Sequence, residues 1–155
     1  LVLKRSITDN VSIPVLSKVK KGLFLSRKTE NDMAMNAVRK YSIKTPSADK
    51  QVMQLSGGNQ QKVILGRWTS EKMATKILIL DEPTKGIDVG TKAEVYQMVC
   101  DFAKQGIGVI FISSELTEVL NVSDVIMVMH NGRISGTVTR EEATEELVLQ
   151  LAMKD

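Results

Sequence analysis

Uninterrupted apolar runs recur along the second half of the chain. Residues 77–80 are four apolar side chains followed by two acids and a proline, and residues 109–112 and 125–129 are similar runs. A run of this length, bounded by charged or turn-forming residues, predicts a strand buried on both faces of a sheet, although a buried helix segment has the same pattern. Pro83 disfavours helical geometry at Glu82, so a strand explains the first run better.

Helical periodicity separates these runs. Residues 29–40 begin with acids and end with basic residues, as the helix dipole favours, and residues 59–69 are a second helical stretch. Thr91 and Glu94 have the spacing of a capping box, which predicts a helix from Thr91 to about residue 105. Strands alternating with helices predict an α/β fold, and the chain up to residue 46 reads as a small, mostly helical part.

Three short signals complete the predicted elements. Ser6 is placed to cap a short helix that ends near Pro14. The dipeptide at residues 131–132, Asn-Gly, predicts a two-residue hairpin turn, with residues 133–138 returning antiparallel. The residues 139–142, Thr-Arg-Glu-Glu, are then expected to cap a final amphipathic helix.

The tandem acids Asp81 and Glu82 follow the first predicted strand directly. Open α/β sheets bind ligands at the carboxyl ends of their strands, where these acids are expected to lie. The arrangement suggests a magnesium nucleotide site, in which Asp81 holds the ion through water and Glu82 orients or deprotonates the attacking water. A solvated strand end is the alternative for this stretch taken alone. Ser113 and Ser114 follow the second strand and are expected at the same edge.

A second candidate for ligand binding is the pair Gly57 and Gly58, preceded by Ser56. Two adjacent glycines let backbone N–H groups approach an anion without interference from a Cβ. The free N–H groups of the helix that follows favour negative charge as well. The pattern therefore suggests phosphate binding, with a flexible turn as the alternative.

Composition narrows the class of protein. With 155 residues, 43% hydrophobic and 25% charged, the chain has the composition of an ordinary globular domain. A net charge of +3 is too small to indicate nucleic-acid binding. Cys100 is the single cysteine, which excludes an internal disulfide and fits a reducing compartment. No signal-peptide pattern and no apolar run of membrane-spanning length occurs, so we expect a cytosolic protein that reaches a membrane through a partner.

The two candidate sites together resemble one family. LSGGNQQKV at residues 55–63, followed by ILILDEPTKGID at residues 77–88, resembles the signature motif, Walker B strand and D-loop of ATP-binding cassette (ABC) ATPases. The ordered pair is specific, whereas neither half is decisive. The segments VILGRW and ISSELTEVL are most similar to the second nucleotide-binding domain of bacterial sugar importers of the ribose or galactose type. Among these we favour galactose and methylgalactoside import.

One motif of the family, the phosphate loop, is missing from this sequence. No GxxxxGK[ST] phosphate loop occurs in the 155 residues. The resemblance therefore implies a partial P-loop NTPase (RecA-like) α/β core that lacks the phosphate-loop strand. Residues 1–57 correspond to the helical subdomain and end in the signature motif, and residues 58–155 correspond to the remainder of the catalytic core.

The resemblance implies a role for each motif residue, with ATP and Mg²⁺ as cofactors. Asp81 would serve the metal ion, Glu82 would be catalytic, and Ser114 would stand where most such ATPases have the switch histidine. Asp88, in the D-loop, would cross the interface between two cassettes. The remaining residues would contact the nucleotide held by a partner cassette, and they are Ser56, Gly57, Gly58, Asn59 and Gln60.

The implied function is the ATP-hydrolysing subunit of a sugar importer, peripheral at the cytoplasmic face of the membrane. Its partners would be a second nucleotide-binding cassette, a transmembrane permease and, indirectly, a periplasmic or extracellular sugar-binding protein, with no nucleic acid. Without a phosphate loop, the 155-residue chain alone is expected to be inactive. Open edges on the strands at residues 109–112 and 125–129 lead us to expect self-association with strand or segment exchange, with direct pairing of the two strands as the alternative. A non-transport cassette ATPase and a non-enzymatic interaction module are the alternatives.

Overall fold

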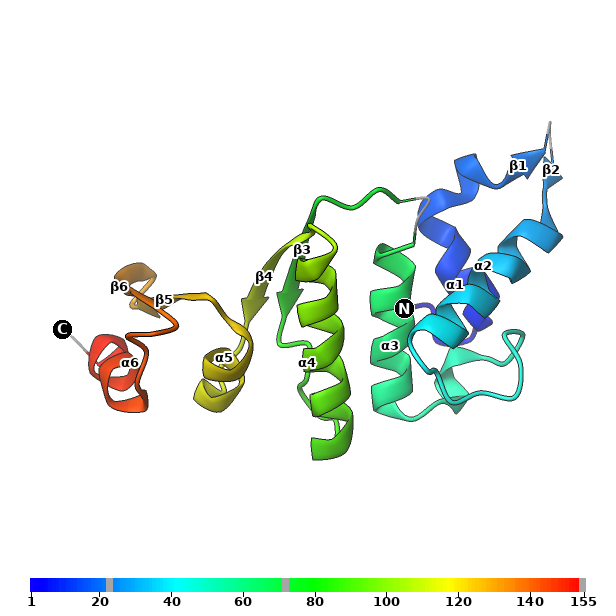
Figure 1. The fold of residues 1–155 in the computed structure, drawn as a ribbon. Helices are drawn as coiled ribbons and strands as arrows, with labels where there is room; N and C mark the ends of the chain where they lie inside the picture. Colours follow the sequence, from blue (N-terminus) through cyan, green and yellow to red (C-terminus); the bar gives the residue numbers. More distant parts are fainter. Residues whose placement is uncertain (22–23, 71–72, 154–155) are drawn as a thin grey trace. The chain divides into compact units, whose positions relative to one another are not determined.

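The structure, a computed structural model, describes residues 1–21, 24–70 and 73–153 (Figure 1). The chain forms two compact units, the first of residues 1–78 and 84–108 and the second of residues 79–83 and 109–155. In the described part of the chain, no helix is both long and apolar enough to cross a membrane. The division after residue 57, which rests on the resemblance, stays a prediction.

Helices dominate the first unit. Its helices are α1 (Ile7–Ser12), α2 (Arg27–Lys40), α3 (Gly57–Trp68) and α4 (Val89–Lys104), joined by 3₁₀ turns at Ile13–Lys18 and Val52–Gln54. The strands β1 (Lys20–Lys21) and β2 (Phe24–Leu25) pair antiparallel. The helices converge on buried apolar side chains, which include Ile7, Val11, Ala34, Leu65, Val95 and Phe102. Burial of this apolar surface is the main source of stability for such a unit.

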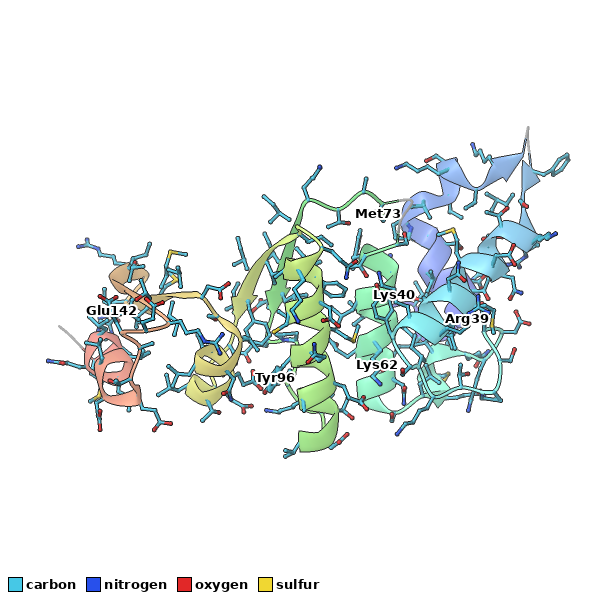
Figure 2. The ribbon with its side chains drawn as sticks, viewed as in Figure 1. Arg39, Lys40, Lys62, Met73, Tyr96 and Glu142 are labelled. Carbon is cyan, nitrogen blue, oxygen red and sulfur yellow. The ribbon has the colours of Figure 1, made fainter. Side chains whose placement is uncertain are left out.

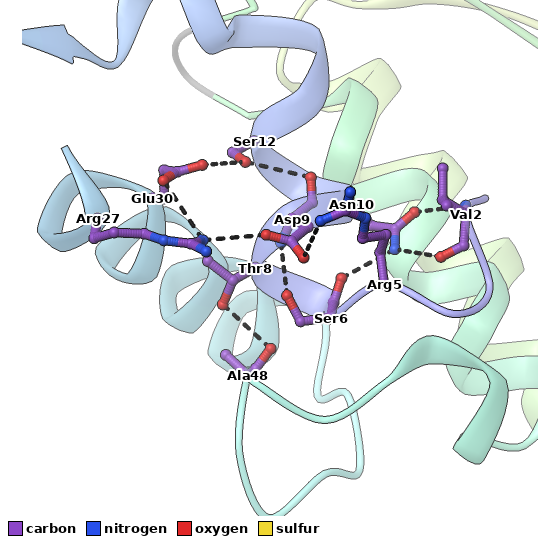
Figure 3. A network of polar contacts seen from close by, with 10 residues as sticks. All are labelled: Val2, Arg5, Ser6, Thr8, Asp9, Asn10, Ser12, Arg27, Glu30 and Ala48. Atoms are coloured by element: carbon purple, nitrogen blue, oxygen red, sulfur yellow. Dashed lines mark hydrogen bonds and ion pairs between the residues drawn. The ribbon is translucent and has the colours of Figure 1, made fainter. Parts of the chain in front are cut away.

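Polar contacts fix α1 beside α2 (Figure 3). Ser6 caps α1 as predicted, because its Oγ accepts the Asp9 N–H at 3.0 Å. Arg27, in the first turn of α2, donates to Asp9 Oδ1 at 3.1 Å, and Ser12 donates to the buried Glu30 carboxylate at 2.8 Å. Partial burial of Asp9 favours a higher pKa, but the hydrogen bonds from Arg27 and Ser6 outweigh it and hold the pKa below its ordinary value.

The strands β3 (Ile77–Asp81) and β4 (Gly108–Ile112) form a two-stranded sheet. At their beginning, Gly108 donates to the carbonyl of Lys76 at 2.9 Å, and at their end Glu82 donates to the carbonyl of Ile112 at 2.9 Å. The two strands therefore run in the same direction, as a strand–helix–strand connection requires. This confirms the prediction that the residues after both strands reach one edge.

Burial on both faces of β3, which the apolar run predicted, is wrong. Leu78 and Leu80 are 7% and 6% exposed, whereas Ile77 and Ile79 are 65% and 63% exposed. Apolar sequence makes a face suitable for burial, but burial itself needs a layer that covers the face. Within the described residues, only the face of Leu78 and Leu80 has such a layer.

The second unit is built around a hairpin. The strands β5 (Val125–His130) and β6 (Arg133–Thr139) pair antiparallel through the predicted Asn131-Gly132 turn, in which both residues have positive φ. The helices α5 (Leu116–Val122) and α6 (Glu145–Ala152) pack on a core of Ile126, Val128, Val138 and Val148. In the described part of the chain, β4 and β5 belong to separate sheets, so the alternative of direct pairing does not occur, and self-association stays a prediction.

Two predicted helix caps are wrong. Asp88, rather than Thr91, caps α4, and Thr144, rather than Thr139, caps α6. In both cases a second cap-forming side chain lies near the predicted one, and the backbone N–H groups that need a partner decide between them. Thr139 and Glu142 still contact each other, since Glu142 Oε2 accepts from the Thr139 hydroxyl at 2.8 Å, but they close a turn before the helix.

Candidate functional site

The acidic edge lies in the second unit, at the carboxyl end of β3. Asp81 is the last residue of the strand and is exposed, and the half-buried Glu82 follows it. The carboxylate of Glu82 accepts the backbone N–H of Ser114 at 2.9 Å. Glu82 is therefore fixed twice, by this bond and by its own N–H on Ile112. The structure brings Glu82 and Ser114 together, as the sequence predicted.

Glu82 has a left-handed backbone, with a φ of +46°. For a residue with a Cβ, this conformation costs about 1–2 kcal/mol. Pro83 follows and is buried, and it restricts the right-handed helical alternative at Glu82. Strain of this kind persists only where the surrounding structure holds it, and it clusters at functional sites.

The two serines after β4 have different roles. Ser113 donates to the buried Glu118 carboxylate at 2.7 Å and accepts the Glu115 N–H at 3.0 Å, so its hydroxyl holds the turn into α5. Ser114 is exposed and contributes its backbone N–H to Glu82. A serine at this position offers a hydroxyl but no imidazole, so it has no group that titrates near neutral pH.

The acids at this edge fit a magnesium ion shared with a ligand. The described residues contain no cluster of three or more His, Cys, Asp or Glu side chains that could hold a metal alone. Mg²⁺ is commonly bound by one or two carboxylates, with waters and substrate phosphates as the other ligands. The exposed carboxylate of Asp81 suits that role, since its oxygens are hard ligands open to solvent.

The signature residues lie in the first unit, at the start of α3. Ser56 is the N-cap residue, yet its side chain makes no capping hydrogen bond to the helix backbone. The first N–H groups of a helix have no intrahelical partner, so those of Gly57 and Gly58 are suited to bind an anion. The predicted helix thus begins two residues earlier than expected, at the glycines themselves.

The side chains of Asn59 and Gln60 brace this turn. Asn59 donates to Ser56 Oγ at 2.8 Å and accepts the Lys44 N–H at 2.8 Å. Gln60 donates to the carbonyl of Leu55 at 3.0 Å. Both amides therefore hold the loop that presents the glycines, which is a different contribution from the nucleotide contact that the resemblance implies.

Asp88 caps α4 with both carboxylate oxygens. Oδ1 accepts the Thr91 N–H at 3.0 Å, and Oδ2 accepts the Thr91 hydroxyl at 2.8 Å. The hydroxyl and backbone hydrogen bonds from Thr91 lower the pKa of Asp88 below its ordinary value. These bonds favour the ionised carboxylate of Asp88 and fix its orientation at the start of α4.

The signature and the D-loop lie together in the first unit. A Cβ added to Gly57 would lie 3.7 Å from Ile87 Cγ2, and a Cβ added to Gly58 would lie 2.2 Å from Thr91 Cγ2. A side chain at position 58 would therefore clash with Thr91, so packing alone favours glycine there. Thr91 is a residue that sequence reasoning misplaced: Asp88-x-x-Thr91 has the spacing of an N-cap and its N3 residue, which was a usable signal.

A cavity elsewhere in the first unit is not part of this site. It has a volume of about 520 Å³ and lies between α2 and the end of α3, where Ala37, Tyr41, Gly66 and Thr69 line it. The signature opens α3, and these residues close it, so the two are separated by about 15 Å of helix. The cavity is too far away to hold a phosphate bound at Gly57 and Gly58.

Comparison with known proteins identifies the family. The model of the family described as ABC transporter matches residues 3–85, which are more than half of the 155 residues. The chain therefore belongs to the ABC transporter family.

Relatives of known name are sugar import proteins. The chain is 50% identical over 149 residues to the arabinose import ATP-binding protein AraG of Pectobacterium atrosepticum, a match that covers 96% of the chain and 29% of that protein. It is 46% identical over 152 residues to the ribose import ATP-binding protein RbsA of Streptococcus agalactiae, a match that covers 98% of the chain and 30% of that protein. The chain thus spans less than a third of the length of these relatives.

Solved structures with the same fold are ABC cassettes. A nucleotide-free ATP-binding cassette from an ABC transporter superimposes with a TM-score of 0.78 at 19% identity, covering 99% of this chain and 65% of that one. A dimeric ATP-binding cassette in a post-hydrolysis state, bound to ADP and Pi, superimposes with a TM-score of 0.74 at 20% identity. This match covers 90% of this chain and 59% of that one. The predicted fold, a partial P-loop NTPase core with a helical part, is confirmed.

Proposed function

We propose that this chain is part of the ATP-hydrolysing subunit of a sugar importer, where it supplies the signature, the acidic strand end and the D-loop. The observation that carries this proposal is the hydrogen bond from the Ser114 N–H to the Glu82 carboxylate, 2.9 Å long. It fixes a half-buried acid next to the exposed carboxylate of Asp81. Hydrolysis of a nucleotide needs such a pair, since one acid serves the metal ion and the other orients or deprotonates water.

Each motif then has its own task. Asp81 holds Mg²⁺, which when bound neutralises charge on the phosphates, and Glu82 acts on the attacking water. The N–H groups of Gly57 and Gly58, with the Ser56 hydroxyl, bind the γ-phosphate of ATP held by a second cassette. Asn59 and Gln60 keep that turn in shape, which the hydrogen bonds of both amides support. Asp88, already ionised and exposed, lies at the interface between the cassettes.

The proposed substrate of transport is a monosaccharide of the ribose or galactose type. The similarity to arabinose and ribose import proteins supports sugar import. The subunit would work at the cytoplasmic face of the membrane with a permease and, through it, with a periplasmic or extracellular sugar-binding protein. Both relatives share a similar identity with this chain, so the proposal stops at the class of sugar.

Glu82→Gln in the full-length subunit that carries this sequence tests the proposal. Loss of the carboxylate should lower ATP hydrolysis about 10²–10⁴-fold, while ATP binding persists because glutamine still accepts from Ser114. Glu141→Gln, at an exposed glutamate in the second unit, is the matched control and should hydrolyse ATP like the parent. Hydrolysis by the Glu82 variant at the parental rate would contradict the proposed role.

The 155-residue chain by itself should neither hydrolyse ATP nor hold it tightly. Most of the affinity in sites of this kind comes from the backbone N–H groups and lysine of a phosphate loop, and the sequence contains no such motif. Titration calorimetry with MgATP checks this, and binding with a Kd of about 1 μM, a free energy near −8 kcal/mol, would show that the chain holds nucleotide by another route.

Ser114 should make the two composite sites of such a subunit unequal. The intact signature serves one site, while Ser114 serves the other without an imidazole. Ser114→His in the full transporter should therefore raise turnover at the second site. Site-resolved hydrolysis measures it, and unchanged turnover there would exclude the asymmetry.

A further inference from the structure

Thr91 contacts both the D-loop and the signature. Its hydroxyl donates to Asp88 Oδ2 at 2.8 Å, and its N–H donates to Oδ1 at 3.0 Å. On its other side, its Cγ2 fills the space that a Cβ on Gly58 would occupy, only 2.2 Å from that position. One side chain therefore connects the first turn of α3 with the residue that opens α4.

The two contacts of Thr91 depend on a single side-chain rotamer. A β-branched side chain is stiff about χ1, and its methyl and hydroxyl groups turn together. Rotation that moved the methyl away from Gly58 would take the hydroxyl away from Asp88. A shift of Gly58 is thus resisted by the cap of α4, and a shift of Asp88 is resisted by the packing of α3.

A second contact, one helical turn further on, keeps the same two helices together. Lys62, four residues after Gly58, extends from α3 toward α4 (Figure 2) and reaches Glu94 Oε2 at 2.5 Å. Glu94 is three residues after Thr91, so the two pairs lie on matching faces of their helices. Lys62 is 3% exposed and also donates to the carbonyl of Ser42, so its position is well defined.

We propose that Thr91 is a positioning residue that makes the signature and the D-loop one rigid body. In this assignment, which rests on the proposed function, Asp88 cannot move at a cassette interface without moving the glycines that bind phosphate. Small displacements matter at such a site, because a misplacement of about 1 Å costs on the order of 100-fold in rate. Thr91 acts through Asp88 and Gly58 and touches no reacting atom itself.

The packing half of the proposal is tested on the 155-residue chain by thermal unfolding of four proteins: the parent, Gly58→Ala, Thr91→Ser and the double variant. Thr91→Ser keeps the hydroxyl that bonds Asp88 and removes the methyl group with which the new Cβ of Gly58→Ala would clash. Gly58→Ala should lower the Tm, and adding Thr91→Ser should restore about 5 °C of the loss. Gly57→Ala is the matched control, since its Cβ would have 3.7 Å of space, and Thr91→Ser should give it no rescue.

The positioning half is tested on the full-length subunit with Thr91→Val, which keeps a methyl and removes the hydroxyl. The kcat for ATP hydrolysis should fall about tenfold or more, while the Kd for ATP stays at the parental value. Thr91→Ser keeps the hydroxyl but loses the methyl contact with Gly58, so it should lower the kcat as well. A double variant that melts no higher than Gly58→Ala would overturn the contact, and a parental kcat for Thr91→Val would overturn the positioning role. A parental subunit that hydrolyses no ATP would instead refute the proposed function, with the coupled melting left intact.

Discussion

The two groups of candidate site residues, one in each unit, are held by different means. In the first unit, side chains hold the signature and the D-loop: Asn59 reaches Ser56, Asp88 reaches Thr91, and Lys62 reaches Glu94. In the second unit, backbone groups hold the acidic edge, since Glu82 depends on the N–H of Ser114 and the carbonyl of Ile112. Braces made of side chains can be removed one at a time, whereas the backbone bond between the Glu82 N–H and Ile112 persists when a side chain is replaced.

The difference also appears in backbone strain. Of the described motif residues, Glu82 is the non-glycine residue with a left-handed backbone, with a φ of +46°. The signature turn needs no such conformation, because Ser56 is extended and α3 begins directly after it. The acidic edge therefore stores strain that strand pairing sustains, while the signature is an unstrained helix start with good packing beneath it.

The largest loss of stability is expected when a buried side chain of α3, the helix that begins at the signature, is removed. Leu65 is fully buried in α3, so Leu65→Ala should lower the free energy of unfolding by about 2–5 kcal/mol through lost burial and the cavity left behind. Denaturation followed by the fluorescence of Trp68, the single tryptophan, measures it in the first unit. Leu3→Ala, at a site 47% exposed in the same unit, is the control and should cost less than about 1 kcal/mol. Equal losses would mean that α3 is not the packed helix described.

The next effect breaks the second contact between α3 and α4. Glu94→Gln removes the charge that faces Lys62, whose side chain is 3% exposed and cannot turn to water. The free energy of unfolding should fall by about 2 kcal/mol, the value of a hydrogen bond to a charged group. Asp101→Asn, in an exposed pair with Lys104 at 3.9 Å, is the control, with an expected change below about 0.5 kcal/mol. A smaller loss for the Glu94 variant than for its control would show that Lys62 is solvated.

The sequence predicted more of the acidic edge than of the signature packing. Parallel strands place their carboxyl ends at one edge, so two apolar runs sufficed to bring Glu82 and Ser114 together. The contact of Gly58 with Thr91 joins two helices and depends on the distance between them, which no local pattern encodes. Sequence reasoning placed the helix cap on Thr91 because Thr91 and Glu94 have the spacing of a capping box. Asp88, three residues earlier, is also a cap-forming residue, and it is the one that caps α4.

The sequence pattern also could not predict which side chains of β3 are exposed. Ile77 and Ile79 are as apolar as Leu78 and Leu80, and the alternation of exposed and buried positions arises only when a layer covers one face. The left-handed backbone of Glu82 left no pattern either, although the proline after it marks an unusual position. Element types follow from periodicity, whereas coverage and strain follow from tertiary structure.

A moderate effect isolates the strain at the acidic edge. Glu82→Gly and Glu82→Ala both lose the bond to the Ser114 N–H, so their difference reports the backbone alone. The glycine variant should be the more stable of the two by about 1 kcal/mol, since glycine adopts a φ of +46° without a Cβ clash. Chemical denaturation followed by circular dichroism measures both. An alanine variant as stable as the glycine variant would show that Glu82 is unstrained.

The smallest effect concerns the charge on Asp88 and depends on pH. The Thr91 hydroxyl and N–H lower the pKa of Asp88 in the folded chain, so the unfolded chain takes up this proton first as the pH falls. The stability that Asp88 contributes is therefore complete above the unfolded pKa of about 3.9 and is lost as the pH falls through the lower, folded value. Asp88→Asn should remove this part of the acid dependence and leave the remainder unchanged. The Tm of both proteins is measured from about pH 2 to about pH 7, a range that includes that pKa. The difference between the two Tm curves gives the contribution of Asp88. Parallel Tm curves throughout would mean that Thr91 does not hold the carboxylate, and the link from the D-loop to the signature would then lack its polar half.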